Sequence, residues 1–276
     1  MRLQASHRAN ISECPSGVAQ GSTQTVLGRR LTRRAVLGGA IASAAAPDVA
    51  LTASADVTDV DLVLMLAADI SRSVDSRKFQ LQRDGYAAAL VDPDVHRAIG
   101  RGRLSRIAIA YMEWSGGTEQ MVLVDWTVIS RLEDARDMAE RIVSSPRAFL
   151  GRTSISSAID VGLAEIARCP YKAPRHLIDI SGDGTHNSGR RLDDARNEAM
   201  AKDVGINAVV ILSEIPLPFN PAHTHPPGGL LAWFETNVIA GEGAFAIPAQ
   251  NFEDFGRSIR TKLIREISMA GSIRRA

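Results

Sequence analysis

The chain alternates short, continuous apolar runs with longer segments in which apolar residues recur at helical spacing. Continuous apolar runs of this length are typical of strands buried on both faces of a sheet. They predict strands at residues 61–67, 106–114, 119–129, 175–183, 206–213 and 244–248. The helical spacing predicts helices at residues 75–92, 131–145, 154–169, about 190–204, 229–239 and 252–269.

The order of these elements predicts an α/β fold. Strands that alternate with helices indicate a Rossmann-like, doubly wound, mostly parallel six-stranded sheet with helices on both faces. One pair is an exception, because only the turn SGGT at 115–118 separates the strands at 106–114 and 119–129. A turn this short makes a hairpin, so one edge strand is expected to be antiparallel.

The first 55 residues have the features of an export signal. The pair Arg33-Arg34 precedes a weakly apolar stretch at 35–46, and the small-residue triplet 53–55 follows. This order matches a charged region, an apolar region and a cleavage site, and the arginine pair is similar to a twin-arginine signal. We expect residues 1–55 to be cleaved and residues 56–276 to form a single domain. A disordered basic tail is the alternative interpretation.

Removing the leader changes the charge balance. It holds six of the 32 basic and two of the 31 acidic residues, which leaves 26 and 29 and a formal charge of −3. This balance gives no indication of nucleic acid as a partner. No second long apolar run follows, so the mature chain is expected to be soluble, without a membrane span, in the periplasm or outside the cell. Cys169 then has no internal partner for a disulfide, because Cys14 leaves with the leader.

Oxygen-bearing side chains follow several of the predicted strands. In sheets of this kind, ligands bind at the carboxyl ends of the strands. The residues at this rim are Asp69, Ser71 and Ser73 after the first strand, Thr153 before the helix at 154–169, and Asp183 after the strand at 175–183. Carboxylate and hydroxyl oxygens suit a hard divalent cation, Mg2+ above all, with Mn2+ or Ca2+ as alternatives. Zinc would favour sulfur or imidazole ligands.

These residues resemble a known family. The motif DISRS at 69–73, the threonine of GRTS and the aspartate of SGDG are similar to the metal-ion-dependent adhesion site (MIDAS) of von Willebrand factor A domains. The resemblance extends over about 59–269 and is strongest to secreted bacterial proteins that consist of this domain alone.

The resemblance implies a role for each residue of the motif. Ser71 and Ser73 would bind the metal directly, Thr153 would bind it directly or through water, and Asp69 and Asp183 would act mainly through water. Arg152 departs from the family pattern, in which glycine is usual at this position, and it places a cation beside the metal.

Other interpretations of the same residues remain open. Asp69 could cap a helix and Ser73 could belong to a turn. The segment 181–189 could be a phosphate loop, although it lacks the lysine of a P-loop. Asp69, Ser71 and His186 could belong to a hydrolase, although no G-x-S-x-G elbow is present.

Two histidines, His223 and His225, lie in a proline-rich loop after the strand at 206–213. They could bind a transition metal, but we expect the loop to be a wall of the ligand groove that lies outside the oxygen set. Replacing both histidines should then leave Mg2+ binding unchanged.

The sequence therefore favours a secreted, metal-dependent binding module that is not an enzyme and that captures a Glu or Asp carboxylate of a partner protein. Arg72, Arg152, His186 and Glu214 are the candidate residues of its ligand groove. The alternative is a metal-dependent hydrolase of phosphate or acyl esters on a similar sheet.

Overall fold

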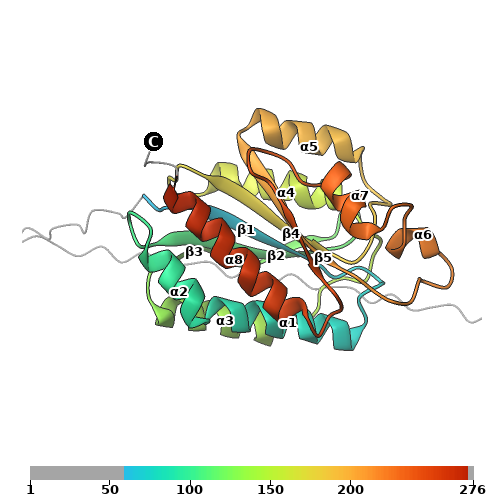
Figure 1. Cartoon of the computed structure of the whole chain (residues 1–276), viewed down its shortest axis with the longest axis horizontal. Coiled ribbons are helices and arrows are strands. Elements are labelled where there is room, and N and C mark those ends of the chain that lie inside the picture. The colour runs from blue at the N-terminus through green and yellow to red at the C-terminus, as the bar shows by residue number, and fades with distance from the viewer. Residues whose placement is uncertain (1–58, 273–276) are drawn as a thin grey trace, which may run out of the picture. The chain divides into compact units, whose positions relative to one another are not determined.

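The computed structural model describes residues 59–272, which form one mixed sheet with helices on both faces (Figure 1). The predicted leader and its cleavage site lie outside the described residues. The strands are β1 (Val63–Asp69), β2 (Ile107–Trp114), β3 (Gln120–Ile129), β4 (His176–Gly182), β5 (Val204–Ile211) and β6 (Ala246–Ala249). The helices are α1 (Ser76–Leu90), α2 (Pro93–Gly100), α3 (Leu132–Ser144), α4 (Ile155–Arg168), α5 (Leu192–Ala201), α6 (Pro221–Thr224), α7 (Leu230–Asn237) and α8 (Phe255–Ser272).

The strand order confirms the predicted fold class. The six strands are arranged in the order β3-β2-β1-β4-β5-β6. Every neighbouring pair is parallel except β2 and β3, which form the predicted antiparallel hairpin at one edge. The carboxyl ends of β1 and β4 are direct neighbours, so the loops that follow them meet at one rim.

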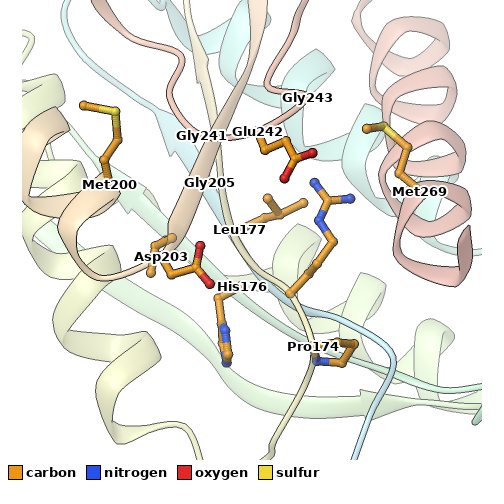
Figure 2. Close-up of a pocket in the computed structure, with 12 residues that line it drawn as sticks. Pro174, His176, Leu177, Met200, Asp203, Gly205, Gly241, Glu242, Gly243 and Met269 are labelled. Atoms are coloured by element: carbon orange, nitrogen blue, oxygen red, sulfur yellow. The ribbon is translucent and has the colours of Figure 1, made fainter. Parts of the chain in front are cut away.

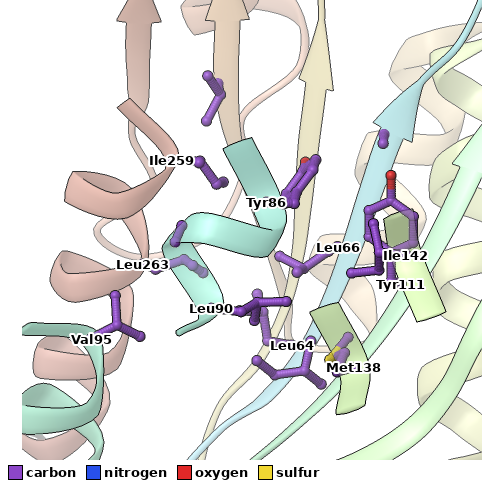
Figure 3. Packing of buried hydrophobic residues seen from close by; sticks show 14 of the residues in the cluster. Leu64, Leu66, Tyr86, Leu90, Val95, Tyr111, Met138, Ile142, Ile259 and Leu263 are labelled. Atoms are coloured by element: carbon purple, nitrogen blue, oxygen red, sulfur yellow. The ribbon is translucent and has the colours of Figure 1, made fainter. Parts of the chain in front are cut away.

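Two apolar cores, one on each face, explain the continuous apolar runs. Helices α1, α2, α3 and α8 cover one face of the sheet, and α4, α5 and α7 cover the other (Figure 1). Along β1, Leu64 and Leu66 point to the first core, which Figure 3 shows, whereas Val63 and Met65 point to the second. Because successive side chains of a strand point to opposite faces, both sets must be apolar.

Two short helices were not predicted. The predicted helix at 75–92 ends at Leu90, and α2 starts only three residues later. The Asp92 carboxylate accepts a hydrogen bond from the Asp94 amide at 2.8 Å, and Pro93 occupies the first turn. This cap starts a new helix. Helix α6 has four residues and starts at Pro221, so it is too short to give a periodic pattern.

Helix α8 packs closely against α1 through two glycines. A side chain at Gly85 would lie 2.7 Å from the Phe255 ring and 3.1 Å from the Gly256 backbone. Glycine at both positions therefore allows the two helices to approach each other, and α8 comes to lie over the sheet beside α1 (Figure 1).

Helix α8 also carries a cation into the core. The Lys262 ammonium lies 2.6 Å from Asp179 Oδ1 of β4 and 2.5 Å from Glu266 Oε1, and all three side chains are fully buried. The Asn207 amide donates a further hydrogen bond to Glu266 Oε1 at 2.7 Å. Burial raises the pKa of Asp179 to about 7, while Lys262 acts in the opposite direction. We call Lys262, Asp179 and Glu266 the core charge cluster.

Between residues 59 and 272, no helix is both long enough and apolar enough to cross a membrane.

Candidate metal site

The loop after β1 is folded by its own polar groups. Strand β1 ends at Asp69, whose Oδ1 accepts a hydrogen bond from the Ser71 amide at 2.7 Å. The Asp75 carboxylate caps α1 by accepting from the Lys78 amide at 2.9 Å. The cap of α1 is therefore Asp75 and not Asp69, contrary to the alternative interpretation of the sequence. Asp69 instead fixes a turn, and this hydrogen bond uses only one of its two carboxylate oxygens.

Arg147 holds the same loop from outside. One guanidinium nitrogen donates to the backbone oxygens of Ile70 (2.6 Å), Ser71 (3.2 Å) and Val74 (2.7 Å). The guanidinium also lies 4.9 Å from the centre of the Phe79 ring. Three bonds from one side chain fix the path of the loop, so the serine hydroxyls are held in position. Sequence reasoning missed Arg147, which comes from the irregular segment between α3 and α4.

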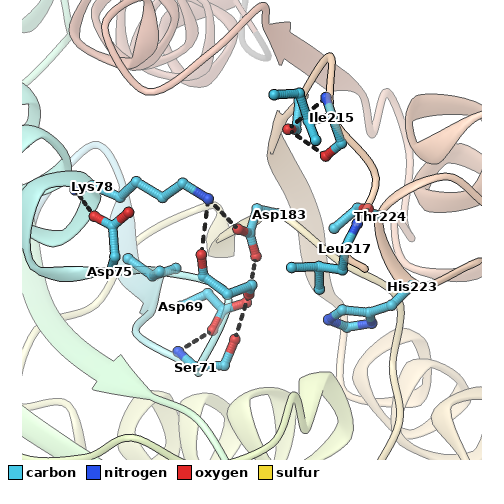
Figure 4. A network of polar contacts seen from close by, with 12 residues as sticks. Asp69, Ser71, Asp75, Lys78, Asp183, Ile215, Leu217, His223 and Thr224 are labelled. Atoms are coloured by element: carbon cyan, nitrogen blue, oxygen red, sulfur yellow. Dashed lines mark hydrogen bonds and ion pairs between the residues drawn. The ribbon is translucent and has the colours of Figure 1, made fainter. Parts of the chain in front are cut away.

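The structure brings together all five predicted ligands, which we call the oxygen site: Asp69, Ser71, Ser73, Thr153 and Asp183. The Ser71 and Ser73 hydroxyl oxygens lie 3.1 Å apart, and Ser73 donates to Asp183 Oδ1 at 2.5 Å (Figure 4). The Thr153 hydroxyl donates to the Ser71 hydroxyl oxygen at 3.2 Å. Side chains from three loops therefore form one continuous polar cluster.

Asn187 fixes the position of Thr153. The Thr153 amide donates to Asn187 Oδ1 at 3.0 Å, and the Asn187 amide donates to the Thr153 backbone oxygen at 2.9 Å. This reciprocal pair ties the loop after β4 to the start of α4, so Thr153 and Asp183 are held by connected segments.

The oxygen site contains two buried carboxylates with little compensating charge. Burial, and to a smaller extent the Asp183 carboxylate, raises the pKa of Asp69 well above its usual value. Burial also raises the pKa of Asp183. The Lys78 ammonium comes no closer than 3.9 Å to Asp183 Oδ2. In the described part of the chain, Asp69 Oδ2 is buried and has neither a hydrogen-bond donor nor an ion-pair partner.

The donor set fits a hard divalent cation. A buried oxygen without a partner requires an explanation, and a bound ion is a common one. The site offers carboxylate and hydroxyl oxygens, which suit Mg2+, Mn2+ or Ca2+. Among residues 59–272, no three His, Cys, Asp or Glu side chains gather as a metal-binding group. The described chain therefore gives no indication of a zinc centre built from imidazole and thiolate.

His223 contacts the oxygen site, contrary to the sequence-based expectation. Its Nε2 lies 3.3 Å from Thr153 Oγ1, and its Nδ1 lies 3.3 Å from Thr185 Oγ1. The ring packs against Gly184, where any side chain would collide with it. Burial lowers the pKa of His223, which favours the neutral ring. His225 is exposed, and its Nδ1 lies 2.9 Å from the Thr224 hydroxyl oxygen, so of the two histidines it is His223 that reaches the oxygen site. The loop does form a wall of the adjacent pocket, as expected.

A pocket of about 430 Å³ opens beside the oxygen site. Its lining includes Ser73, Thr153 and His223, together with Arg72 and Arg152 from the predicted groove. His186 and Glu214, the other two candidates for this groove, are not among its lining residues. His186 Nε2 lies 3.0 Å from the Arg190 backbone oxygen, and Glu214 is exposed after β5.

A larger cavity of about 810 Å³ lies at the opposite end of the sheet (Figure 2). It is lined by the amino ends of β4 and β5, by the turn at 241–243 and by Met269 of α8. Its charged side chains include both signs, among them Arg175, Asp203 and Glu242. We assign the function to the smaller pocket, because it borders the oxygen site at the carboxyl ends of the strands.

Comparisons with known proteins agree with this architecture. A family model described as "Protein of unknown function (DUF1194)" matches residues 59–271. Among curated proteins, no match is found.

Three solved structures illustrate the likeness in fold. Proximal thread matrix protein 1 from the mussel byssus, with a zinc-occupied MIDAS motif, is 13% identical with a TM-score of 0.53, over 77% of this chain and 47% of that one. The pilus adhesin SpaC from Lactobacillus rhamnosus GG is 12% identical with a TM-score of 0.53, over 78% and 31%. A von Willebrand factor type A protein from Catenulispora acidiphila is 13% identical with a TM-score of 0.50, over 75% and 43%. The match spans less than half the length of each of these proteins, and at such identity it shows the fold alone.

Proposed function

This chain belongs to the DUF1194 family, and from that membership and its von Willebrand factor A fold we propose that it is a metal-dependent binding module. The oxygen site would hold one divalent cation, and the free position on that cation would take a Glu or Asp carboxylate of a partner protein. The observation that carries the proposal is the buried Asp69 Oδ2, which lacks a partner beside a second buried carboxylate and three hydroxyls.

Each residue of the oxygen site has a definite part in this proposal. The Ser71 and Ser73 hydroxyls would bind the ion directly, and Thr153 would bind it directly or through water. Asp69 and Asp183 would supply charge through bound water. Two ionised aspartates neutralise a doubly charged ion, but neutral direct ligands leave it strongly electrophilic. A bound ion therefore supplies an attraction for an external carboxylate, to which Arg152 adds a second positive charge.

The identity of the ion follows from the ligand chemistry. Hydroxyl and carboxylate oxygens favour Mg2+, with Mn2+ or Ca2+ as alternatives. The mussel protein carries zinc in its MIDAS motif, which supports a divalent ion in this kind of site. For this chain the all-oxygen set favours a harder ion than zinc.

Thermal unfolding with Mg2+ and with a chelator tests the proposal. Mg2+ at a hundredfold excess over its dissociation constant should stabilise the wild type by about 2.7 kcal/mol. Asp183→Ala should abolish this effect without destabilising the metal-free fold, because it removes one of two close carboxylates. Asp137→Ala, at an exposed position of α3, is the matched control and should keep the full effect.

Two results would contradict the proposal. Equal melting temperatures of the wild type in both conditions, with no metal by elemental analysis, would mean that the site binds no ion. Turnover of ester or phosphoester substrates with Mg2+ would instead support the hydrolase alternative.

We also propose that residues 1–55 direct export through a twin-arginine signal. Replacing Arg33 and Arg34 together by lysine should leave the precursor in the cytoplasm, because the pair is read by the export receptor and does not act as bulk charge. Fractionation of cells that express both forms tests this. Unchanged delivery across the membrane would rule out the twin-arginine route.

A further inference from the structure

The rim around the oxygen site exposes unusual apolar surface. Six large apolar side chains of the described residues are exposed, and the three most exposed are Leu150 (60%), Ile215 (77%) and Phe219 (102%). Phe219 lines the 430 Å³ pocket, and Leu150 and Ile215 belong to the segments 149–153 and 213–223, which contribute other residues to its lining. Exposed apolar groups that gather at one place mark an interaction surface more often than scattered ones do.

The same rim carries two arginines without acidic partners. The Arg72 guanidinium donates to the Leu150 backbone oxygen at 3.0 Å, and that of Arg152 donates to the Asn187 backbone oxygen at 2.8 Å. Neither forms an ion pair with any acidic side chain in residues 59–272. Both are exposed and line the pocket. Arginines with free N–H groups are suited to binding a carboxylate.

The apolar and basic features share one pocket with the oxygen site. Arg72 and Arg152 lie on the side of Gly151, whereas Leu217 and Phe219 lie on the side of the loop after β5. Figure 4 shows Leu217 and His223 beside the polar cluster that contains Ser71 and Asp183. A volume of about 430 Å³ is larger than one carboxylate needs, so the pocket has room for neighbouring groups of a ligand.

We propose that this surface binds a peptide segment of a partner protein in which two acidic residues lie close together beside a bulky apolar residue. This inference rests on the proposed function, in which the first carboxylate binds the metal. The second carboxylate pairs with Arg72 and Arg152, and the apolar side chain packs against Leu217 and Phe219.

The charges favour a protein segment over a membrane surface. A polybasic patch that binds anionic lipid needs several lysines or arginines, whereas this rim offers two. The predicted mature chain carries a formal charge of −3, which opposes attraction to an anionic surface. The pocket is also concave and contains oriented oxygens, which suit a defined ligand.

A displayed library of random linear peptides tests the ligand class. The library is panned on the exported full chain in the presence of Mg2+, and bound peptides are eluted with a chelator. Eluted sequences should share two acidic residues within a few positions of a Phe, Leu or Ile. Eluted sequences with a single acidic residue or with basic residues would overturn the inference, and so would a lack of enrichment.

Substitutions test which residues bind the second carboxylate and which bind the apolar side chain. Arg72→Gln combined with Arg152→Gln should weaken the binding of a selected peptide at least tenfold. The double variant should also no longer prefer this peptide over one in which the second acidic residue is replaced by the corresponding amide. Leu217→Ser combined with Phe219→Ser, which replaces the two large apolar side chains of the pocket lining, should remove the apolar preference. Arg103→Gln, at an exposed position before β2, is the control and should bind like the wild type.

Direct Mg2+ titration separates this inference from the proposed function. The arginine variant should bind Mg2+ at least as tightly as the wild type, because it removes positive charge beside the ion, and the apolar variant should bind Mg2+ as the wild type does. If the wild type does not bind Mg2+, the proposed function is overturned. If the wild type binds Mg2+ but the variants bind the peptide as tightly as the wild type does, this inference alone is overturned. Binding to anionic phospholipid vesicles without Mg2+ would also overturn it, in favour of a lipid surface.

Discussion

Two aspartates four residues apart are buried in different electrical surroundings. Asp179, within β4, has the Lys262 ammonium 2.6 Å away in the core charge cluster. Asp183, just after β4, lies in the oxygen site with a second carboxylate nearby and its nearest ammonium at 3.9 Å. Both side chains are buried, and burial raises both pKa values.

The difference separates a structural charge from a functional one. In the core charge cluster the chain supplies its own cation, Lys262, although Asp179 Oδ2 and Glu266 Oε2 are also buried without a hydrogen-bond donor among the described residues. In the oxygen site the chain supplies the oxygen ligands, but most of the positive charge that would neutralise the two carboxylates has to come from a bound cation. A buried carboxylate whose counter-charge is missing from the chain is thus the better indicator of an ion site.

Removing the cation of the core charge cluster should have the largest effect. Lys262→Met would leave Asp179 and Glu266 buried with no compensating charge, and we expect a loss of about 3–5 kcal/mol in the free energy of unfolding. Urea unfolding with chelator measures it.

Lys78→Met is the control at the oxygen site. Its ammonium lies 2.9 Å from the Ser73 backbone oxygen, but its side chain is 31% exposed. We expect a loss below about 1 kcal/mol. If the two variants lost equal stability, the two regions would not differ as described.

The dependence of stability on pH should differ between the two regions. An acid whose pKa is raised in the folded state stabilises the fold at low pH, and this contribution is lost as pH rises through the raised value. In chelator, the melting temperature should therefore fall as pH rises from 5 to 8. Mg2+ binds the ionised oxygen site, so the stabilisation by Mg2+ should grow as pH rises through the raised pKa values of Asp69 and Asp183, towards about 2.7 kcal/mol at hundredfold excess.

Asp179→Asn isolates the core charge cluster in the same experiment. Since the pKa of Asp179 is raised to about 7, its substitution should flatten the fall in melting temperature below pH 7. The difference between the Mg2+ and chelator curves should stay as in the wild type. A constant effect of Mg2+ at every pH would be evidence that the aspartates of the oxygen site do not bind the ion.

The two histidines of the loop after β5 should differ in their effect on Mg2+ binding. His223 supports Thr153 at 3.3 Å, and the loss of a group that orients a metal ligand typically costs about tenfold or more in affinity. His223→Ala should weaken Mg2+ binding about tenfold, and His223→Gln should restore part of it by offering a hydrogen bond. His225→Ala should have no effect. Isothermal titration with Mg2+ measures all three, and equal affinities would show that His223 only fills space.

Much of the fold could be predicted because its central strands are buried on both faces. Strand β1 is apolar from Val63 to Ala68, which makes it visible as a run, and the five-residue connection between β2 and β3 is short enough to indicate a hairpin. Helices α2 and α6 were missed for a local reason. Asp92-Pro93 and Pro221 start new helices too short to produce a periodic pattern.

The oxygen site could be predicted in part for a similar reason. Asp69, Asp183 and Thr153 flank elements with clear patterns, so topology alone brings them to one rim. Arg147 and His223 come from irregular segments, whose paths no periodicity specifies. Lys262 was missed because a lysine on an amphipathic helix normally lies in water. The one available signal was the aspartate within the apolar run of β4.

The position of Lys262 on the last helix has a consequence for the order in which the protein is made. Asp179 leaves the ribosome before α8, so this aspartate has no cation until α8 has also emerged. Contacts between segments so far apart in sequence form slowly. Docking of α8 on this face of the sheet also brings Lys262 to the buried Asp179. A nascent or truncated chain that ends before Phe255 would expose a charged carboxylate in an open apolar face, the kind of surface that chaperones bind.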